Sequence, residues 1–586
     1  MQKKKPLKEI IAISPAHPDA GEEIIEPSRI CEAVAEKYKV TWGSGDPELW
    51  VRQLNFCLDR DHIALNFDHE EITIAFRRVA RRSLKDVHGV AVEALRCIFE
   101  ANSSFFALVL EAYMTSTVEV QNTKIVGKVQ GKMTSKPHLG QVRAIMPLPA
   151  LHALADVLLA NRLRQFCETH FPPNPSIHIG AVPNTQVMDI AHATQTVIEK
   201  GLDRFSKAAV SQSDIAAYYD NLPVFNIAAS LHAAGAAPAL TGALLRHQML
   251  PQVVLETAGH QEPVPRRTHG SLTGSRVAGA LGRWPVELAA REVVNDRTVH
   301  GFTMTSGPPL MIATYVDNLY GFGDTAFQAV HILKRMEHLL KSRWDLKIKQ
   351  GSEEVLVCRG APELSGSETE PPSVVHGFAI RDSMVVLGHL ISSDAAPDAC
   401  FRRTELSVVA RFWGSAAARP LRRWCLERRL QILRRCVTPV WLFRAARWAA
   451  TAELARWIDR LQRRLFVKLI RYVPMPGENI AAFVRRRGRA VAHIQREAGP
   501  WSTMYLRRVI SWHEHVLRRP AMHWMRRLLQ EQPDSWLQNR RLSRGTPAHA
   551  GRTGTRLRGP VRVRWQTSVT WAREELARRP VPRARL

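Results

Sequence analysis

Apolar residues recur at helical spacing in five long stretches of the chain. These stretches are residues 68–110, 148–167, 185–205, 275–295 and 324–341. In each of them apolar side chains return every three or four positions, which places them on one face of a helix. Asp68 precedes the first stretch, with Glu70 and Glu71 close behind it. An N-cap residue followed by acids in the first turn is typical of a helix start.

Shorter apolar runs lie between these helices and favour strands. They are residues 123–128, 142–146, 211–220, 310–320, 346–348 and 355–358. Each run is short and rich in β-branched or aromatic residues, which is typical of strands. Because strands and helices are mixed along the chain, the pattern predicts an α+β fold.

The pattern changes towards both ends. Residues 1–55 are mixed and contain prolines, so we expect a loosely packed lead-in there. After residues 385–390 the chain becomes helical and rich in Arg and Trp. Residues 360–372 have the composition of a Ser/Glu/Pro loop, and residues 540–560 have that of a disordered segment.

The charge balance favours a polyanionic partner. The 586 residues include 82 Lys plus Arg against 54 Asp plus Glu, a net charge of +28. Such an excess is typical of proteins that bind nucleic acid through its phosphates. The alternative is an arginine-biased coding sequence with no such partner.

The cysteines and the hydropathy pattern indicate an intracellular protein. The eight cysteines are scattered with no Cys-x-x-Cys pair, as expected for reduced thiols rather than for disulfides or a zinc site. No secretory leader is expected after Met1, and no apolar run is long enough for a membrane span. We expect the nucleus, a cytoplasmic ribonucleoprotein, or both.

Two acids stand in apolar surroundings and are candidates for metal binding. Asp214 lies in the strand predicted at 211–220, and Asp317 lies within Tyr315-Val316-Asp317-Asn318, at the tip of a strand hairpin predicted at 310–320. Transfer of a nucleotide by two metal ions needs carboxylates that converge on two cations about 3.5–4 Å apart. Burying a carboxylate is costly unless a metal or hydrogen bonds compensate it. The alternative for either residue alone is an ordinary acid at a strand end.

These segments resemble those of a known enzyme family. The stretch Asp214-Ile-Ala-Ala-Tyr-Tyr-Asp220, the loop at 267–275, the tetrapeptide ending in Asn318 and the hairpin at 387–394 are similar, in this order, to motifs of reverse transcriptases from non-LTR (LINE-type) retrotransposons. The resemblance extends from about residue 68 to about residue 570.

The resemblance implies a right-hand polymerase fold with an antiparallel palm sheet. It places a lead-in at 1–67, fingers at 68–210, and a palm at 211–390 with an interleaved fingers segment at about 225–265. A helical thumb at 391–480 and a basic, partly disordered tail at 481–586 follow. The implied activity is RNA-directed DNA synthesis, with an RNA template, a DNA primer and deoxynucleoside triphosphates as partners.

The resemblance also assigns roles to residues. Asp214 and Asp317 would hold Mg²⁺ or Mn²⁺, with Asn318 beside them, and Tyr219 would exclude the ribose 2′-hydroxyl. The remaining candidates are Arg143, Lys128, Gly270 and Gly274 for the nucleotide, and Gly388 and His389 for the primer and template. The oligomeric state is left open.

Two departures from the family pattern keep a second hypothesis open. Asn318 replaces the second acid of the family's Tyr-x-Asp-Asp, and Ser352 stands where relatives have a lysine, with Lys349 the nearest substitute. These departures favour a weakened polymerase, or a polymerase-shaped protein that binds nucleic acid without catalysis. A third hypothesis is an unrelated basic scaffold, in which Asp214 and Asp317 lie far apart. No endonuclease or RNase H signature is recognised.

Overall fold

The computed structural model divides the chain into two interleaved units. The structure describes residues 10, 12–13, 23–43, 65–79, 90–115, 120–129, 132–134, 136–146, 148–203, 206–257, 259–358, 374–393, 398–415, 424–448, 450–470, 472–531 and 565–579. Unit 1 comprises Met1–Pro173, Asp214–Glu292 and Arg335–Gln350. Unit 2 comprises Asn174–Ser213, Val293–Lys334 and Gly351–Leu586. The loop predicted at 360–372 and the segment predicted as disordered at 540–560 lie outside the described residues.

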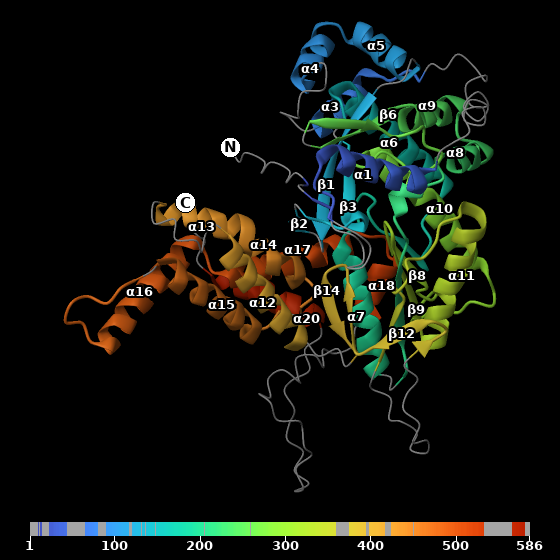
Figure 1. Ribbon diagram of the computed structural model, residues 1–586. Helices are drawn as coiled ribbons and strands as arrows, with labels where there is room; N and C mark the ends of the chain where they lie inside the picture. Colours follow the sequence, from blue (N-terminus) through green and yellow to red (C-terminus); the bar gives the residue numbers. More distant parts are fainter. Residues whose placement is uncertain are drawn as a thin grey trace. The chain divides into compact units, whose positions relative to one another are not determined.

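Unit 1 combines a helical group with a small sheet (Figure 1). Its helices are α1 (Pro27–Trp42), α3 (His69–Arg78), α4 (Val92–Ala101), α5 (Ser103–Thr115), α6 (Ala150–His170), α8 (Val224–Ala233), α9 (Pro238–Met249) and most of α10 (Arg276–Asn295). Its sheet has the order β2-β1-β6-β7, with β3 paired to β1. The strands are β1 (Val120–Val129), β2 (Lys132–Thr134), β3 (Val142–Ile145), β6 (Gln252–Thr257) and β7 (His260–Pro263).

Helix α1 corrects one expectation. The N-terminal stretch was predicted to be loosely packed, but residues 27–42 form a helix that starts with a proline in its first turn. Ile30, Val34, Tyr38 and Trp42 recur at helical spacing, are buried, and belong to one core with β6 and β7 neighbours such as Val253. Packing of this face stabilises the helix. Composition alone does not show the apolar repeat, because polar residues lie between its members.

Unit 2 is built on a seven-stranded mixed sheet, so the chain has an α+β architecture. The strand order is β11-β12-β10-β5-β9-β8-β4. The strands are β4 (Ile177–Ile179), β5 (Ala209–Asp214), β8 (Ile312–Tyr315), β9 (Asn318–Gly323), β10 (Glu354–Val357), β11 (Val374–Val375) and β12 (Phe378–Arg381). Strands β8 and β9 form an antiparallel hairpin, β10 is antiparallel to β5, and β4 is parallel to β8. In this order the strand ending in Asp214 neighbours the strand that follows Asp317.

Glycines in β9 allow helix α11 (Ala326–Trp344) to lie close to the sheet. A Cβ atom at Gly321 would stand 2.5 Å from the Ala329 carbonyl oxygen and 2.7 Å from Ser211 Oγ. A Cβ atom at Gly323 would stand 2.5 Å from the Ala329 nitrogen. The close approach also allows a hydrogen bond between β5 and the helix, since the Ser211 hydroxyl donates to the Ala329 carbonyl at 2.6 Å.

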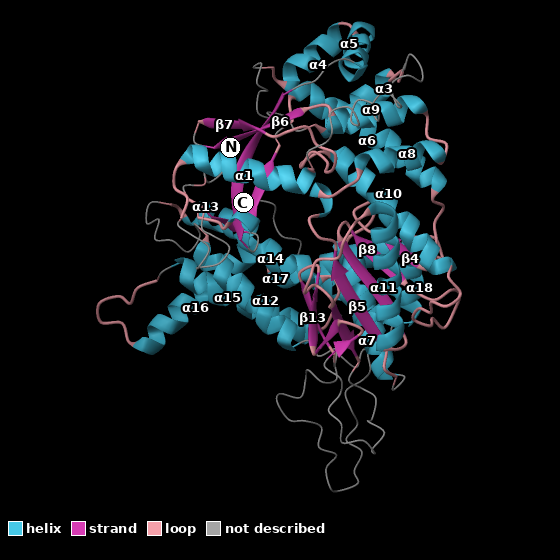
Figure 2. Ribbon diagram, turned by 45° about the vertical axis from the view of Figure 1, so that its right-hand side comes forward, coloured by secondary structure: helices cyan, strands magenta, loops and turns pink. Residues whose placement is uncertain are grey.

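The C-terminal half of unit 2 is helical with a tryptophan-rich core (Figure 2). It contains the hairpin β13 (Ser383–Val386) and β14 (His389–Ser392), and then α12 (Asp398–Gly414), α13 (Leu426–Ile432), a π-helical turn (Leu433–Val437), α14 (Thr438–Ala445), α15 (Ala452–Ile470), α16 (Ile480–Ala498), α17 (Trp501–Leu517), α18 (Trp524–Glu531) and α20 (Trp565–Arg578). Trp441, Trp501, Trp512 and Trp524 are almost fully buried. No helix among the described residues is long and apolar enough to cross a membrane.

Candidate active site

Asp317 lies in a strained two-residue turn. Tyr315 pairs with Asn318 across the β8–β9 hairpin, so Val316 and Asp317 form the turn itself. Val316 has φ +61°, a conformation that a β-branched residue rarely adopts. Such a residue costs about 1–3 kcal/mol and persists only where the surroundings enforce it, which is common at functional sites. The Asn318 side-chain amide donates to Asp317 Oδ1 at 2.9 Å.

Gly180 supports this hairpin from the neighbouring strand. Its backbone N–H donates to the Thr314 carbonyl at 2.7 Å and continues the pairing of β4 with β8. A Cβ atom at this position would stand 2.5 Å from Tyr315 Cδ2 and 2.6 Å from the Thr314 carbonyl oxygen. Only glycine therefore allows the Tyr315 ring to lie where it does, one residue before the turn.

Asp214 ends strand β5 and is fastened to the segment around Lys349. Its carbonyl accepts the Lys349 backbone N–H at 2.7 Å, and Ile215 forms an isolated bridge with Ile348. The Lys349 Nζ atom lies 3.5 Å from Asp214 Oδ2, with 28% of the aspartate side chain exposed. A partly exposed carboxylate on a fixed strand end remains accessible to a cation. Lys349, which the sequence offered as a substitute for the family lysine, lies beside this acid.

Tyr219 lies on a short 3-10 turn that follows Asp214. Ala217 takes φ +42° and turns the chain into this segment, Tyr218–Asp220. The Tyr218 hydroxyl donates to the carbonyl of Gly282 in α10, and that ring is buried. The backbone carbonyl of Tyr219 accepts the Ser271 N–H at 2.8 Å. The Tyr219 hydroxyl lies near α10, since a Cβ atom at Gly279 would stand 3.9 Å from it. The Tyr219 side chain is therefore half-buried, with its hydroxyl near Gly279 of α10.

Gly270 and Gly274 shape the loop before α10. Gly270 has φ +80°, and a Cβ atom there would stand 2.7 Å from both the Asp220 carbonyl oxygen and Trp42 Cδ1. Gly274 has φ +107° and lies near the Met146 carbonyl. Both positions favour glycine because their backbone lies in the left-handed region. The loop thereby approaches the turn that bears Tyr219.

Two buried polar residues fix the start of α10. Asp156 Oδ2 accepts the Arg276 backbone N–H at 2.7 Å, and its Oδ1 accepts the Ser275 hydroxyl. Gln248 donates to Ser275 Oγ at 2.9 Å and accepts the Leu272 N–H at 2.9 Å. A carboxylate at a helix N-terminus is stabilised by the first N–H groups and the helix dipole. These side chains come from α6 and α9, and neither was a candidate in the sequence.

A charged cluster around Asp220 was also not recognised in the sequence. Trp42 Nε1 donates to Asp220 Oδ1 at 3.2 Å, and burial raises the pKa of this acid against the lowering effect of Trp42, Arg143 and Lys37. Burial, and then the nearby charge of Arg143, lowers the pKa of Lys37 to about 8. The Lys37 ammonium donates to the Val142 carbonyl at 2.9 Å. The only sequence signal was the apolar repeat of α1, which carries Lys37 and Trp42 here.

Arg267 anchors the glycine loop from inside the same cluster. It is 2% exposed, and it donates to the carbonyls of Gly270 and Gln248. Burial lowers its pKa to about 10, while the charge of Asp220 acts in the opposite direction. A buried arginine with backbone partners on both sides of a loop fixes that loop in place.

The other nucleotide candidates lie on the sheet of unit 1. Arg143 is in β3, paired with Val126 of β1, and its side chain is exposed. Lys128 is in β1, paired with Met133 of β2, and its side chain lies outside the described residues.

The primer candidates Gly388 and His389 lie at the turn of the β13–β14 hairpin. Gly388 has φ +88°, and its carbonyl accepts Arg444 Nε at 3.0 Å. His389 is fully buried against Phe443, with ring centroids 4.8 Å apart. Burial, and then the charges of Arg447 and Arg444, lower the pKa of His389 well below its usual value. Its imidazole therefore packs inside the unit, whereas Gly388 is exposed.

Asp214 in unit 1, and Asp317 with Asn318 in unit 2, each offer oxygen donors of the kind that Mg²⁺ prefers. Both offer carboxylate oxygens, which hard divalent cations prefer, and Asn318 adds an amide oxygen without charge. Within the described residues, no three His, Cys, Asp or Glu side chains form a ready-made metal cluster. Sites for nucleotide-bound Mg²⁺ characteristically use one or two carboxylates together with substrate phosphates. The residues present fit this kind of site.

Comparison with known proteins adds no assignment. No protein-family model matches the chain, and no curated protein matches it.

Proposed function

We propose that the protein is an RNA-directed DNA polymerase of a LINE-type retroelement. The observation that carries the proposal is the strained β8–β9 turn, which presents Asp317 at the tip of a hydrophobic hairpin. The strand order adds support, since β5, which ends in Asp214, neighbours β9. The remaining support is the order in which the motifs occur along the chain.

Asp214, Asp317 and the amide oxygen of Asn318 would hold the metal ions. Bound Mg²⁺ or Mn²⁺ would activate the primer 3′-hydroxyl and neutralise charge on the triphosphate and the leaving pyrophosphate. The protein contributes fixed positions for the two carboxylates, through the Lys349 backbone at Asp214 and the turn at Val316. Such preorganisation removes the need to order the ligands during reaction.

The residues of unit 1 would select and orient the nucleotide. Tyr219, whose backbone carbonyl is bonded by Ser271 and whose hydroxyl lies near Gly279 of α10, would clash with a ribose 2′-hydroxyl, a repulsive contact that gives specificity for deoxynucleotides. The exposed Arg143 guanidinium suits the triphosphate because it can bind phosphate oxygens in a bidentate manner. The close-packed loop at Gly270 would approach the nascent base pair.

The basic helices of unit 2 would bind the template and primer. Exposed arginines lie on α15, α16 and α17, whereas Trp441 of α14 and Trp501 and Trp512 of α17 are buried. Guanidinium groups on the helix surface suit contacts with the phosphates of a duplex.

A second candidate function rests on the Asn318 hydrogen bond. Asn318 brings no negative charge and donates to an oxygen of Asp317 that a metal would use. This arrangement favours a protein that keeps the polymerase shape and binds nucleic acid but catalyses slowly or not at all. Only the first function predicts incorporation of deoxynucleotides. Both functions predict salt-dependent binding of nucleic acid.

Primer extension on an RNA template tests the proposal. The full chain should incorporate deoxynucleotides with Mg²⁺ or Mn²⁺, and Asp214→Asn and Asp317→Asn should each abolish incorporation while template binding is retained. Asp345→Asn is the matched control, because Asp345 is an exposed acid of the same kind that belongs to neither motif. Incorporation that survives Asp317→Asn would exclude the proposed site. Binding without incorporation in the unaltered chain would favour the second candidate.

A further inference from the structure

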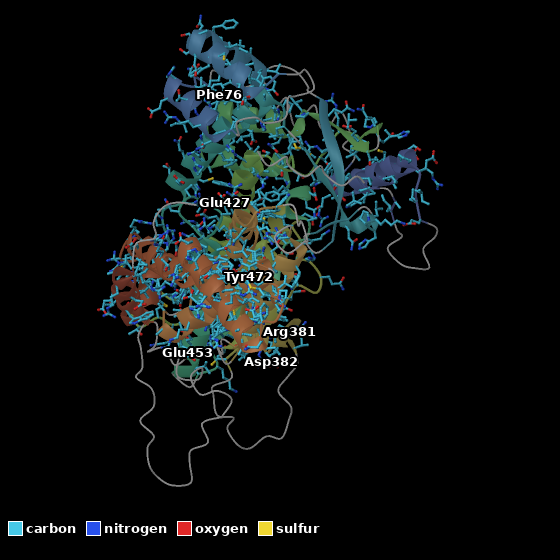
Figure 3. All side chains as sticks on the ribbon, turned by 90° about the vertical axis from the view of Figure 1, so that its left-hand side faces the viewer. Phe76, Arg381, Asp382, Glu427, Glu453 and Tyr472 are labelled. Atoms are coloured by element: carbon cyan, nitrogen blue, oxygen red, sulfur yellow. The ribbon has the colours of Figure 1, made fainter. Side chains whose placement is uncertain are left out.

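The segment that joins α15 to α16 forms an ordered apolar projection, which we call the α15–α16 tip (residues 472–484). In Figure 1 this segment and α16 extend beyond the other helices of unit 2. Figure 3 labels Tyr472 at its start. The segment belongs to neither the candidate active site nor the buried core of the helical region.

The α15–α16 tip is held in one conformation by Arg486. This guanidinium donates to Glu478 Oε1 at 2.9 Å, to Glu478 Oε2 at 2.7 Å and to the Val473 carbonyl at 2.9 Å. It also lies over the Tyr472 ring, 4.9 Å from the ring centroid. The hydrogen bonds from Arg486, and then from the Met475 backbone, lower the pKa of Glu478 to about 2. The Asn479 side chain caps α16 by accepting the Ala482 N–H at 2.8 Å.

This conformation exposes large apolar side chains. Val473 is 73% exposed, Met475 56%, Ile480 82% and Val484 47%. Pro474 and Pro476 lie exposed between them. Several large apolar side chains exposed together on an ordered segment indicate a site for another molecule.

Arginines flank the exposed apolar side chains. On α16, Arg485 and Arg489 are exposed and lie one turn apart, next to Ile480 and Val484. Between residues 480 and 496 the sequence has five arginines and no acid. A surface of this charge complements phosphates, and side chains at i and i+4 share one helix face.

We propose that the α15–α16 tip binds double-helical nucleic acid and acts as a wedge. Arg485 and Arg489 contact phosphates on one side of a groove, and Met475 and Ile480 enter between neighbouring base steps. Proteins that open base steps use this pairing of apolar wedge residues with flanking arginines. The fixed geometry set by Arg486 reduces the entropy lost when the apolar side chains enter the duplex. The inference does not require Asp214 or Asp317 and is independent of polymerase activity.

The observations favour a duplex over a membrane surface. The exposed apolar side chains come from a turn with two prolines and the first turns of one helix, rather than from the long face of an amphipathic helix. The other side of α16 packs against α15, because the Gln495 amide donates to both Gln462 Oε1 and the Asp459 carbonyl there. The cations are arginines, which suit bidentate binding of phosphate.

The salt dependence of duplex binding tests the arginine contacts. We would measure the affinity of the full chain for a DNA duplex and for an RNA–DNA hybrid between about 50 and about 200 mM salt. The double variant R485A/R489A should lower the magnitude of the log–log slope by about two, one unit for each phosphate contact. R573A/R578A is the matched control, since it removes two exposed arginines of α20, which lies outside the α14 to α17 helices. Equal slopes in both double variants overturn the proposal.

A base analogue tests the wedge. The fluorescence of 2-aminopurine in the duplex should rise on binding of the unaltered chain, because opened base steps release it from stacking. M475S/I480S should lose that rise while keeping the salt slope. A rise that persists in M475S/I480S overturns the wedge. Binding to vesicles of anionic phospholipid that M475S/I480S abolishes, without any fluorescence change on duplex, overturns the assignment to nucleic acid in favour of a membrane surface.

Neither measurement includes a deoxynucleoside triphosphate, so neither depends on polymerase activity. They can fail while primer extension succeeds, and they can succeed while extension fails. Circular dichroism of each variant confirms that α16 is retained.

Discussion

At the scale of single residues, the proposed polymerase activity depends on Asp317 and Asn318. The sequence predicted the position of Asp317 at a hairpin turn, and the turn at Val316 and Asp317 confirms that local structure. The sequence could not predict that Asn318 donates to Asp317 Oδ1, because an asparagine side chain has both donor and acceptor faces. Asn318 brings no charge to the site, and its amide occupies one carboxylate oxygen of Asp317.

Replacing Asn318 with aspartate should increase polymerase activity. Asn318→Asp adds one carboxylate and removes the amide donor to Asp317, so the site gains one negative charge and Asp317 Oδ1 is released for a metal ion. We expect kcat for primer extension with Mg²⁺ to rise by about tenfold, which corresponds to about 1.4 kcal/mol in the barrier.

The control for this change is Asn295→Asp, which adds the same charge at the exposed end of α10. An unchanged or lower kcat in Asn318→Asp, or an equal rise in Asn295→Asp, contradicts the role given to Asn318.

At the scale of elements, the sequence predicted helices with a strong apolar period. It did not predict short strands that form by pairing with a neighbouring strand. Helices α6, α7 (Val187–Asp203), α10 and α11 and the β8–β9 hairpin lie where the apolar pattern predicted them. Strands β4, β6 and β7 were missed, because β4 and β7 are short and polar positions occur throughout β7. Such strands form because a neighbouring strand offers hydrogen bonds, which is tertiary information.

The close approach of α11 to β9 predicts a large cost for a single methyl group. Gly321→Ala would place Cβ against the Ala329 carbonyl and Ser211 Oγ, so the helix or the strand must shift. We expect a loss of about 1–3 kcal/mol in the free energy of unfolding. Gly488→Ala is the control, because Cβ meets nothing within 4 Å there and alanine favours the α16 helix by up to about 1 kcal/mol. Thermal unfolding should show opposite shifts for the two variants, and shifts of the same sign contradict this packing.

The C-terminal helices α17 and α18 are attached to α7 and β4 through buried polar groups. Asp189 of α7 lies 3.6 Å from His515 Nε2, and His178 of β4 packs edge-on against Trp524 at 4.8 Å. Burial lowers the pKa of His178 to about 4, with Asp189 acting in the opposite direction and His523 and Arg519 adding to the shift. Burial and Arg519 lower the pKa of His523 to about 4 as well.

This attachment should weaken in mild acid. The unfolded chain binds protons on these histidines below about pH 6.5, whereas the folded chain does not bind them until about pH 4. Stability is therefore retained above pH 6.5 and falls as the pH drops from 6.5 to 4. His178→Phe should reduce the difference in unfolding midpoint between pH 7 and pH 4.5, while His493→Phe, at an exposed position on α16, should not. Equal differences in all three proteins contradict this prediction.

At the scale of the whole molecule, the sequence predicted class and charge but not the division into units. The α+β class is confirmed. The two units are drawn from interleaved segments, so that Asp214 begins a segment of unit 1 while the preceding residues of β5 belong to unit 2. The Asp220 cluster shows why such features are hidden, since it joins Trp42, Lys37 and Arg267 across more than 200 positions of sequence through packing alone.

The net charge predicts a steep salt dependence of template–primer binding. With a net charge of +28, we expect a log–log slope of affinity against salt of about −5, set by release of cations from the nucleic acid. Filter binding or fluorescence anisotropy with an RNA–DNA hybrid measures it. A slope close to zero would show that the charge has no nucleic-acid partner.

We propose that Asp214 and Asp317 hold the same pair of metal ions. Cleavage of the chain by Fe²⁺ bound in place of Mg²⁺, with ascorbate and peroxide, measures which backbone segments lie beside the metal. The account predicts cuts both at the end of β5 and at the β8–β9 turn, suppressed by excess Mg²⁺ and absent in Asp317→Asn. Cuts at only one of the two segments, or cuts that survive Asp317→Asn, would contradict it.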